Sequence, residues 1–222
     1  MQIAIIGAGE VGRAYLRAPG AARIHTVLVC DPSPSQETLE VVERTGATLH
    51  RELSGWLASA HRVWLCVTGD LAPVVCRDML KYIGSETVIV DLTTASAADK
   101  RDSFALAAAR QVDYVDAVIL GAIATTAART PLLAAGALAA TAMHDFEEPG
   151  APVRVLERAH AGDAAVLKLL RTIVTKGLEA LAVECLVAAE QLGVRRELYE
   201  AMSDIDRTGF ANFLDMLATA TG

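Results

Sequence analysis

The sequence predicts an α/β fold: a doubly wound, mostly parallel sheet followed by a small all-α part. Short runs of β-branched and aliphatic residues alternate with stretches of helical composition, which is typical of βαβ crossovers. Continuous apolar runs such as VWLCV indicate strands that helices cover on both faces. After about residue 162 the strand signals stop and an uninterrupted helical pattern begins.

Taken in order, the strand runs lie at 2–7, 25–31, 47–50, 62–68, 87–93, 112–120, 130–136 and 153–157, and helical stretches separate most of them. A helix of about 30 residues then runs from about 163 to Gly193, and two shorter helices are expected at about 195–204 and 207–220. A helix of that length spans about 45 Å, which is too long for it to cover a small sheet alone. The long helix therefore marks a second, helical domain.

Charge and composition exclude several classes of partner. The formal charge is -7 and no run is rich in Lys or Arg, so we expect no nucleic-acid partner. Glu10 and Arg13 interrupt the first apolar run, which also lacks a basic leader and a cleavage site, so we expect a cytoplasmic protein without a membrane partner.

The cysteines at 30, 66, 76 and 185 show neither metal nor redox spacing. We expect no metal site, and we interpret the cysteines as small buried residues.

The first strand leads directly into GAGEVG, in which Gly7, Gly9 and Gly12 have the G-x-G-x-x-G spacing. The first glycine permits the tight turn, the second lets a pyrophosphate approach the backbone, and the third lets the helix pack closely on the strand. The whole turn, including Ala8, Glu10 and Val11, is therefore predicted to bind a dinucleotide in a Rossmann domain at 1–161. The remainder, 162–222, is predicted to be a helical substrate and dimerisation domain.

Asp31 ends the second strand, about 20 residues after the glycine motif. An acid there accepts hydrogen bonds from ribose hydroxyls and repels a 2′-phosphate. No arginine directly follows it, so we expect NAD as the cofactor, with NADP less favoured.

The fourth and fifth strands end in LCVTGD and VDLTTAS, at the sheet edge where ligands bind in open α/β folds. Val67, Thr68 and Thr93 are predicted to line the cofactor site, and Thr94 and Ser96 offer hydroxyls to a polar substrate. Ser96 also fits a helix cap, because Asp99 follows it at the capping spacing.

Together these segments resemble the β-hydroxyacid dehydrogenase superfamily of 3-hydroxyisobutyrate and 6-phosphogluconate dehydrogenase-like enzymes. IAIIGAGEVG is similar to the family's cofactor turn, VDLTTAS to its substrate loop, and YVDAVILGA to its acid-containing strand and glycine loop. GDAAVLKLLRT is similar to the family segment G-x(5)-K-x(3)-N, in which the lysine is the catalytic acid/base. The resemblance implies that Lys168 is catalytic, that Thr172 occupies the asparagine position, and that Gly121 lies in the substrate loop.

The sequence departs from the family at three points. Thr172 replaces the usual asparagine, DAVILGA replaces the loop D-A-P-V-S-G-G, and the helical part is shorter than is usual in the family. Asp116 begins that altered loop, and both an approach to the cleft and strand-end capping explain it equally well. These are the positions that select the substrate, so the sequence does not identify it.

A helical wheel places Lys168, Thr172, Thr175 and Glu179 on one narrow polar stripe of an otherwise apolar helix. A snorkelling surface lysine is one explanation of this pattern. A lysine that faces a wet cleft and exchanges a proton with substrate is the other, and the family resemblance favours it.

We therefore expect an NAD(P)-dependent oxidoreductase of CH–OH groups that acts on a small polar substrate, a 3-hydroxy acid and its oxo partner. The apolar faces of the long helix predict a homodimer formed through the C-terminal helices. An imine reductase-like enzyme and a non-catalytic dinucleotide sensor or scaffold are the alternatives.

Overall fold

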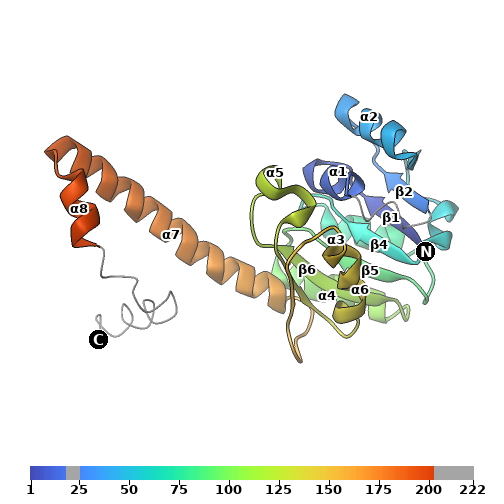
Figure 1. Cartoon of the computed structure of the whole chain (residues 1–222). Coiled ribbons are helices and arrows are strands. Elements are labelled where there is room, and N and C mark those ends of the chain that lie inside the picture. Colours follow the sequence, from blue (N-terminus) through green and yellow to red (C-terminus); the bar gives the residue numbers. More distant parts are fainter. Residues whose placement is uncertain (19–25, 203–222) are drawn as a thin grey trace. The chain divides into compact units, whose positions relative to one another are not determined.

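The computed structural model describes residues 1–18 and 26–202, which contain one eight-stranded sheet (Figure 1). The strand order is β3-β2-β1-β4-β5-β6-β7-β8, and every neighbouring pair is parallel except the antiparallel pair β6–β7. The strands are β1 (Gln2–Ile6), β2 (Thr26–Cys30), β3 (Thr48–His50), β4 (Arg62–Leu65), β5 (Val88–Asp91), β6 (Asp113–Ile119), β7 (Leu132–Ala135) and β8 (Val153–Val155). The predicted doubly wound, mostly parallel α/β sheet is confirmed.

Helices follow most strands, as the alternating pattern predicts. The α-helices are α1 (Glu10–Leu16), α2 (Gln36–Thr45), α3 (Ala72–Met79), α4 (Ala97–Ala108), α5 (Ile123–Thr126), α6 (Ala139–Glu147), α7 (Asp163–Leu192) and α8 (Arg195–Ala201). Two short 3-10 helices are η2 (Gly55–Ser59) and η3 (Ala127–Arg129). The expected long helix is α7, and Gly193 follows it in the left-handed conformation at φ 72°. The expected helix at 207–220 lies outside the described residues.

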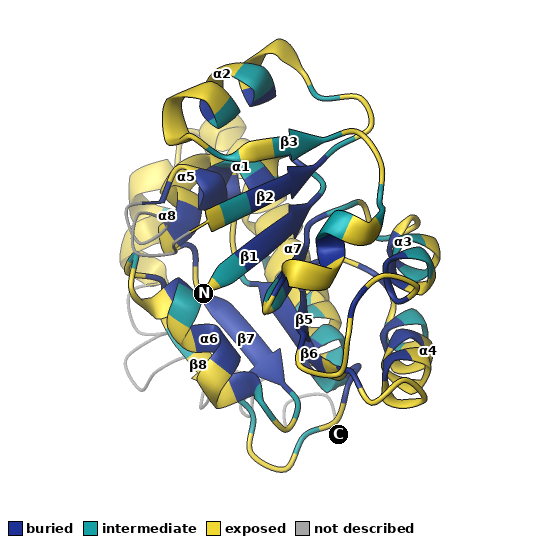
Figure 2. Cartoon of the chain, turned by 90° about the vertical axis from the view of Figure 1, so that its right-hand side faces the viewer, coloured by how far each residue is buried: buried dark blue, intermediate teal, exposed yellow. Residues whose placement is uncertain are grey.

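Most residues of β1, β5, β6 and β7 are buried (Figure 2). The core occupies both faces of the sheet, because successive side chains of a strand point to opposite faces. Along β1, Ile3 and Ile5 join one buried cluster, whereas Ala4 and Ile6 join the other. Phe146 of α6 packs in the first cluster and Met79 of α3 in the second. This double burial explains why the strands read as continuous apolar runs.

The expected burial of the four cysteines is confirmed for three and wrong for Cys185. Cys30, Cys66 and Cys76 are buried free thiols, whereas Cys185 on α7 is exposed. Burial raises the pKa of Cys76 to about 12, so this thiol stays protonated. The buried cysteines therefore act as small apolar residues.

Contacts divide the chain into two compact units, Met1–Leu170 and Arg171–Gly222, and the division falls inside α7. The first turns of α7, which carry Lys168, therefore belong with the sheet. In the second unit, several apolar side chains of α7 are exposed, among them Ile173, Leu181 and Val187. Within residues 1–18 and 26–202, no helix combines the length and apolar character needed to span a membrane.

Candidate functional site

The glycine turn between β1 and α1 has the geometry that its spacing predicts. Gly7 has φ 91°, and a Cβ there would lie 2.9 Å from Val67 Cγ1. A Cβ on Gly12 would lie only 2.1 Å from the Gly7 carbonyl oxygen, so α1 can approach the turn only without a side chain there. By contrast, nothing lies within 4 Å of the Cβ position of Gly9. The open side of the turn is therefore at Gly9, where a ligand can reach the backbone.

The peptide of Ala8, at the centre of this turn, is held from both ends. Its N–H donates to Asp31 Oδ2 at 2.9 Å, and its carbonyl oxygen accepts from Thr38 Oγ1 at 2.9 Å and Arg13 Nη1 at 3.1 Å. Asp31 Oδ1 also accepts from the Ser33 N–H at 2.9 Å. Asp31 thus supports the glycine turn as well as facing the cavity beside it. Sequence reasoning missed Thr38 and Arg13, because their contacts with Ala8 depend on how α2 and α1 pack.

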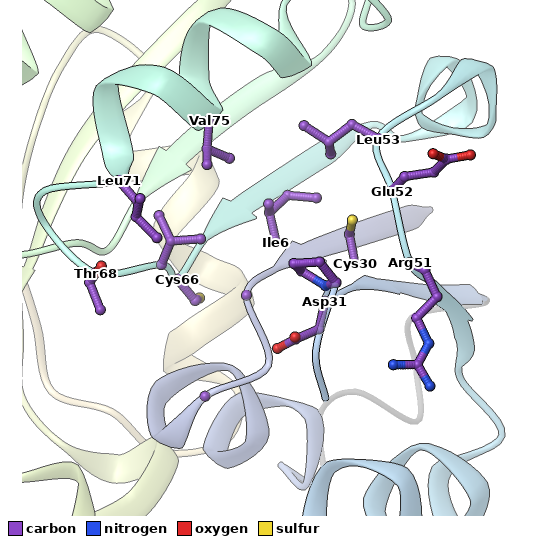
Figure 3. Close-up of a pocket in the computed structure, with 14 residues that line it drawn as sticks. Ile6, Cys30, Asp31, Arg51, Glu52, Leu53, Cys66, Thr68, Leu71 and Val75 are labelled. Carbon is purple, nitrogen blue, oxygen red and sulfur yellow. The ribbon is translucent and has the colours of Figure 1, made fainter. Parts of the chain in front are cut away.

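A cavity of about 510 Å³, here called the Asp31 cavity, lies at the carboxyl ends of β1, β2 and β4 (Figure 3). Its lining is mostly apolar: Ile6, Gly7, Gly9, Cys30, Asp31, Pro32, Arg51, Glu52, Leu53, Cys66, Val67, Thr68, Leu71 and Val75. It lies where the strand order reverses between β1 and β4, which is where doubly wound folds bind ligands. Its size and apolar walls suit an adenosine group.

Arg51 is the positively charged residue of this cavity, and sequence reasoning missed it. It follows His50, whose strand position pairs with Cys30, so Arg51 and Asp31 emerge from adjacent strand ends. The Asp31 N–H donates to the His50 carbonyl oxygen at 3.1 Å, which fixes the two ends together. An arginine and an aspartate thus line the same part of the cavity, although Arg51 lies far from Asp31 in sequence.

A second cavity of about 310 Å³, the Lys168 cavity, adjoins the first. Its lining contains most of the predicted site residues from the ends of β5, β6 and α7: Glu10, Val11, Cys66, Val67, Leu92, Thr93, Thr94, Ile119, Gly121, Ala122, Ile123 and Lys168. Cys66 and Val67 line both cavities, so the end of β4 separates them. Thr68 lines the Asp31 cavity, away from Lys168.

Lys168 is half-buried at the Lys168 cavity. Burial lowers the pKa of its amine, the Lys100 ammonium lowers it further, and Asp116 opposes the shift. A lysine with a lowered pKa exchanges protons more readily near neutral pH. Thr172 lies one helical turn beyond Lys168 on α7, within the second unit.

Ser96 takes the structural role that its sequence context also allowed. Its hydroxyl accepts from the Asp99 N–H at 3.1 Å and bonds Asp99 Oδ2 at 2.7 Å, so it caps α4. Thr94, two residues earlier, is exposed and lines the Lys168 cavity, whereas Ser96 lies outside it.

Asp116, for which two roles were open, is completely buried. Its Oδ2 accepts from the N–H groups of Gly162 at 2.9 Å and Ala165 at 3.3 Å, and its Oδ1 accepts from Lys100 Nζ at 2.8 Å. It therefore caps the start of α7, a helix far along the chain, instead of lining the cavity. In the part of the chain that the structure describes, no cluster of three or more His, Cys, Asp or Glu side chains is arranged to hold a metal ion.

The chain matches one family model and is similar to several known proteins. Residues 2–148 match the family model of the NAD-binding domain of 6-phosphogluconate dehydrogenase. An uncharacterised 28.5 kDa protein of Methanothermus fervidus is 25% identical over 213 residues, which are 96% of this chain and 80% of that protein.

Two solved structures illustrate the likeness of the fold. A Mycobacterium tuberculosis 3-hydroxyisobutyrate dehydrogenase, solved with L-serine, is 24% identical with a TM-score of 0.79, over 94% of this chain and 71% of that one. An imine reductase variant from Myxococcus stipitatus, solved with NAD+, is 18% identical with a TM-score of 0.78, over 92% of this chain and 72% of that one. At these identities the likeness establishes the fold.

Proposed function

The chain belongs to the family of the NAD-binding domain of 6-phosphogluconate dehydrogenase, and from that membership we propose an oxidoreductase that transfers a hydride between a nicotinamide cofactor and a small polar substrate. The substrate class that we propose is a 3-hydroxy acid and its oxo partner. The observation that carries the proposal is the adjacency of the two cavities, since Cys66 and Val67 line both and Lys168 lines the second. A cofactor that passed from one cavity to the other would bring its reactive ring toward Lys168.

The residues of the Asp31 cavity fit a dinucleotide. Gly9 leaves space beside the backbone for a pyrophosphate, and Asp31 retains lone pairs for ribose hydroxyls after accepting from Ala8 and Ser33. Leu71 and Val75 provide an apolar surface for a base. We therefore assign the adenosine half of the cofactor to this cavity.

When bound, the nicotinamide supplies or accepts the hydride. Lys168 handles the accompanying proton: its neutral amine takes the proton of the substrate hydroxyl during oxidation, and its ammonium returns a proton to the oxo oxygen during reduction. The Ala95 N–H donates to Thr93 Oγ1 at 3.3 Å, which orients the Thr93 hydroxyl at the cavity. Thr93, Thr94 and the backbone at Gly121 would bind the polar end of the substrate, and Thr172 would replace the family's asparagine as the neighbour of Lys168.

We propose NAD as the preferred cofactor, because the Asp31 carboxylate repels a 2′-phosphate. Arg51 in the same cavity acts in the opposite sense, since a guanidinium binds phosphate well. Imine reductases from Myxococcus stipitatus have been solved with NAD+ and with NADP+, so both cofactors occur among proteins of this fold.

We also propose that the protein is a homodimer that works in the cytoplasm. Leu181 is 64% exposed and Ile173 is 62% exposed, and a second copy of α7 would cover such side chains. The buried free thiols are consistent with a reducing compartment.

Imine reduction is the second candidate, supported by the fold likeness to imine reductases. Lys168 disfavours it, because the resemblance associates a lysine at this position with hydroxy acids. The two activities differ in the atom that receives the proton, an oxygen in one and a nitrogen in the other.

The test combines binding and turnover. Thermal-shift titration with NAD, NADH, NADP and NADPH identifies the cofactor, and panels of 3-hydroxy acids, oxo acids and cyclic imines are then assayed by the absorbance of the reduced nicotinamide. We expect oxidation of a 3-hydroxy acid that Lys168→Ala abolishes without loss of NAD binding, whereas the exposed Lys176→Ala control retains it. Turnover of imines alone would support the second candidate, and binding without turnover would support a dinucleotide sensor.

A further inference from the structure

A buried charge network lies behind the Lys168 cavity, and its centre is Lys100 of α4. This side chain is 0% exposed. Its Nζ donates to Asp116 Oδ1 at 2.8 Å, to the Asp91 carbonyl oxygen at 3.0 Å and to the Ala117 carbonyl oxygen at 3.1 Å. All three ammonium protons therefore have acceptors, which is what a buried lysine requires.

The Asp91 side of the network holds one wall of the Lys168 cavity. Asp91 Oδ1 accepts from the Thr93 N–H at 2.8 Å and lies 3.5 Å from Lys100 Nζ. Tyr114 Oη donates to Asp91 Oδ2. Burial, reinforced by the Asp91 charge, raises the pKa of Tyr114 well above its usual range, so the phenol stays a donor. The hydrogen bond to Asp91 holds the Thr93 backbone in place, and Thr93 lines the Lys168 cavity. This wall of the cavity therefore depends on Asp91.

The Asp116 side holds the start of α7, which carries Lys168. Asp116 accepts from the N–H of Gly162, just before α7, and from the N–H of Ala165 in its first turn, where N–H groups have no partners within the helix itself. Gly162 precedes α7 with φ 93°, and a Cβ there would lie 2.7 Å from the Ala97 carbonyl oxygen of α4. The start of α7 is thus seated directly against α4, little more than one helical turn before Lys168.

We propose that Lys100 is a positioning residue, which joins the Thr93 wall and the α7 wall through Asp91 and Asp116 and sets the electrostatic environment of Lys168. The proposal rests on the role of Lys168 proposed above. Lys168 lies among charges from several elements: Lys100 of α4, Asp116 of β6, Glu10 of α1 in the same cavity, and Asp91 behind Lys100. Buried pairs of this kind are costly to desolvate, which favours a functional over a stabilising role.

The two partners of the pair have opposite effects on Lys168, which makes the proposal testable. Lys100 lowers the pKa of the Lys168 amine, and Asp116 raises it. Asp116→Asn keeps one oxygen that can accept from Gly162, so it retains the cap; it removes the negative charge and the acceptor that Asp116 Oδ1 offers to Lys100. We expect it to move the Lys168 titration to lower pH, and Lys100→Met to move it to higher pH.

The measurement is an NMR titration of the protein after reductive ¹³C-methylation of its lysines. Lys168→Arg identifies the Lys168 signal, and the exposed Lys81 and Lys176 serve as internal references. Ser103→Ala, a buried uncharged change on the same helix, is the matched control and should leave the titration in place. The double variant Lys100→Met/Asp116→Asn leaves fewer buried charges unpaired, so it provides a folded protein if Lys100→Met does not fold. The pKa of Lys168 in the double variant should be higher than in Asp116→Asn.

Turnover gives the second readout. In Lys100→Met or the double variant we expect kcat to fall about tenfold or more and NAD affinity to change less, because the Lys168 cavity loses its wall positions while the Asp31 cavity, proposed for the adenosine half, keeps its lining. Identical Lys168 titrations in wild type, Asp116→Asn and the folded Lys100 variant would overturn the proposal. Since the titration needs neither substrate nor turnover, failure to find an enzymatic activity would count against the proposed function and leave this result to stand separately.

Discussion

The carboxylate of Asp31 accepts a 2.9 Å hydrogen bond from the backbone N–H of Ala8, so the acid at the end of β2 is tied to the glycine turn after β1. This contact holds the turn, and in the proposed cofactor complex the same carboxylate would also face a ribose. These two roles can be separated by substitution.

Asp31→Asn keeps an oxygen for the Ala8 N–H but removes the charge that attracts ribose hydroxyls. We expect NAD binding to weaken by about 1.5–3 kcal/mol, the usual value of a hydrogen bond to a charged group, and discrimination against NADP to fall. Isothermal titration calorimetry with both cofactors measures this. Glu52→Gln, which removes another acid of the same cavity, is the control and should change binding little.

Arg51→Ala should weaken NADPH binding about tenfold while NADH binding stays nearly constant, because only the former carries the 2′-phosphate. Competition titration of the two reduced cofactors provides the comparison. Equal weakening of both would show that Arg51 contacts a part that the cofactors share.

Two glycines of the same turn should respond differently to alanine. Gly12→Ala places a Cβ against the Gly7 carbonyl, so we expect a loss of about 1–3 kcal/mol in the free energy of unfolding. Gly9→Ala meets no protein atom, so stability should hold while NAD affinity falls. Denaturant unfolding and calorimetry on both variants test the pair. A Gly9→Ala protein that binds NAD normally would contradict the placement of the pyrophosphate.

The pH dependence of oxidation should report Lys168, because the neutral amine is the base. Since burial lowers its pKa, kcat/KM should rise with pH and level off below the pH expected for an ordinary lysine. The free energy of unfolding should also rise with pH. The folded state binds the Lys168 proton less tightly than the unfolded chain does, so stability increases as the pH rises from the folded-state pKa of Lys168 to its unfolded-state pKa. Thermal unfolding of the wild type and of Lys168→Met is measured over a range of pH. The stability of the wild type relative to Lys168→Met should decrease as the pH falls.

The apolar side chains of α7 predict the assembly state. Leu181→Glu should convert a dimer to a monomer in light scattering at micromolar concentration, because the charge would be buried in the interface. Gln191→Glu adds the same charge at an exposed polar position of the helix and should leave the dimer intact. A wild-type protein that is monomeric under these conditions would exclude the proposed homodimer.

The sequence predicts the fold well, because inner strands such as β5 and β7 are buried on both faces and therefore read as continuous apolar runs. Gly7, Gly9 and Gly12 likewise predict their own geometry, since their constraints arise within one short turn. A sequence pattern therefore predicts structure well when the residues that determine that structure are close together in the sequence.

Residues whose roles depend on distant neighbours could not be predicted in this way. Lys100 lies in the run AADKRDSF, whose charges are typical of an exposed helix face, yet it is completely buried because β5 and β6 present carboxylates to it. Arg51 reaches the Asp31 cavity because β3 pairs with β2. The two possible roles of Asp116 could be separated only once its contacts with the start of α7 were known.

The end of β4 has a consequence for how this protein can evolve. A Cβ on Gly7 would collide with Val67, so the partition formed by Cys66 and Val67 is already in close contact with the glycine turn. A bulkier residue there would change the shape of both cavities at once, because Cys66 and Val67 line both. Gly121, Ala122 and Ile123 line the Lys168 cavity but not the Asp31 cavity, so substitutions there can change the first cavity while the second keeps its lining.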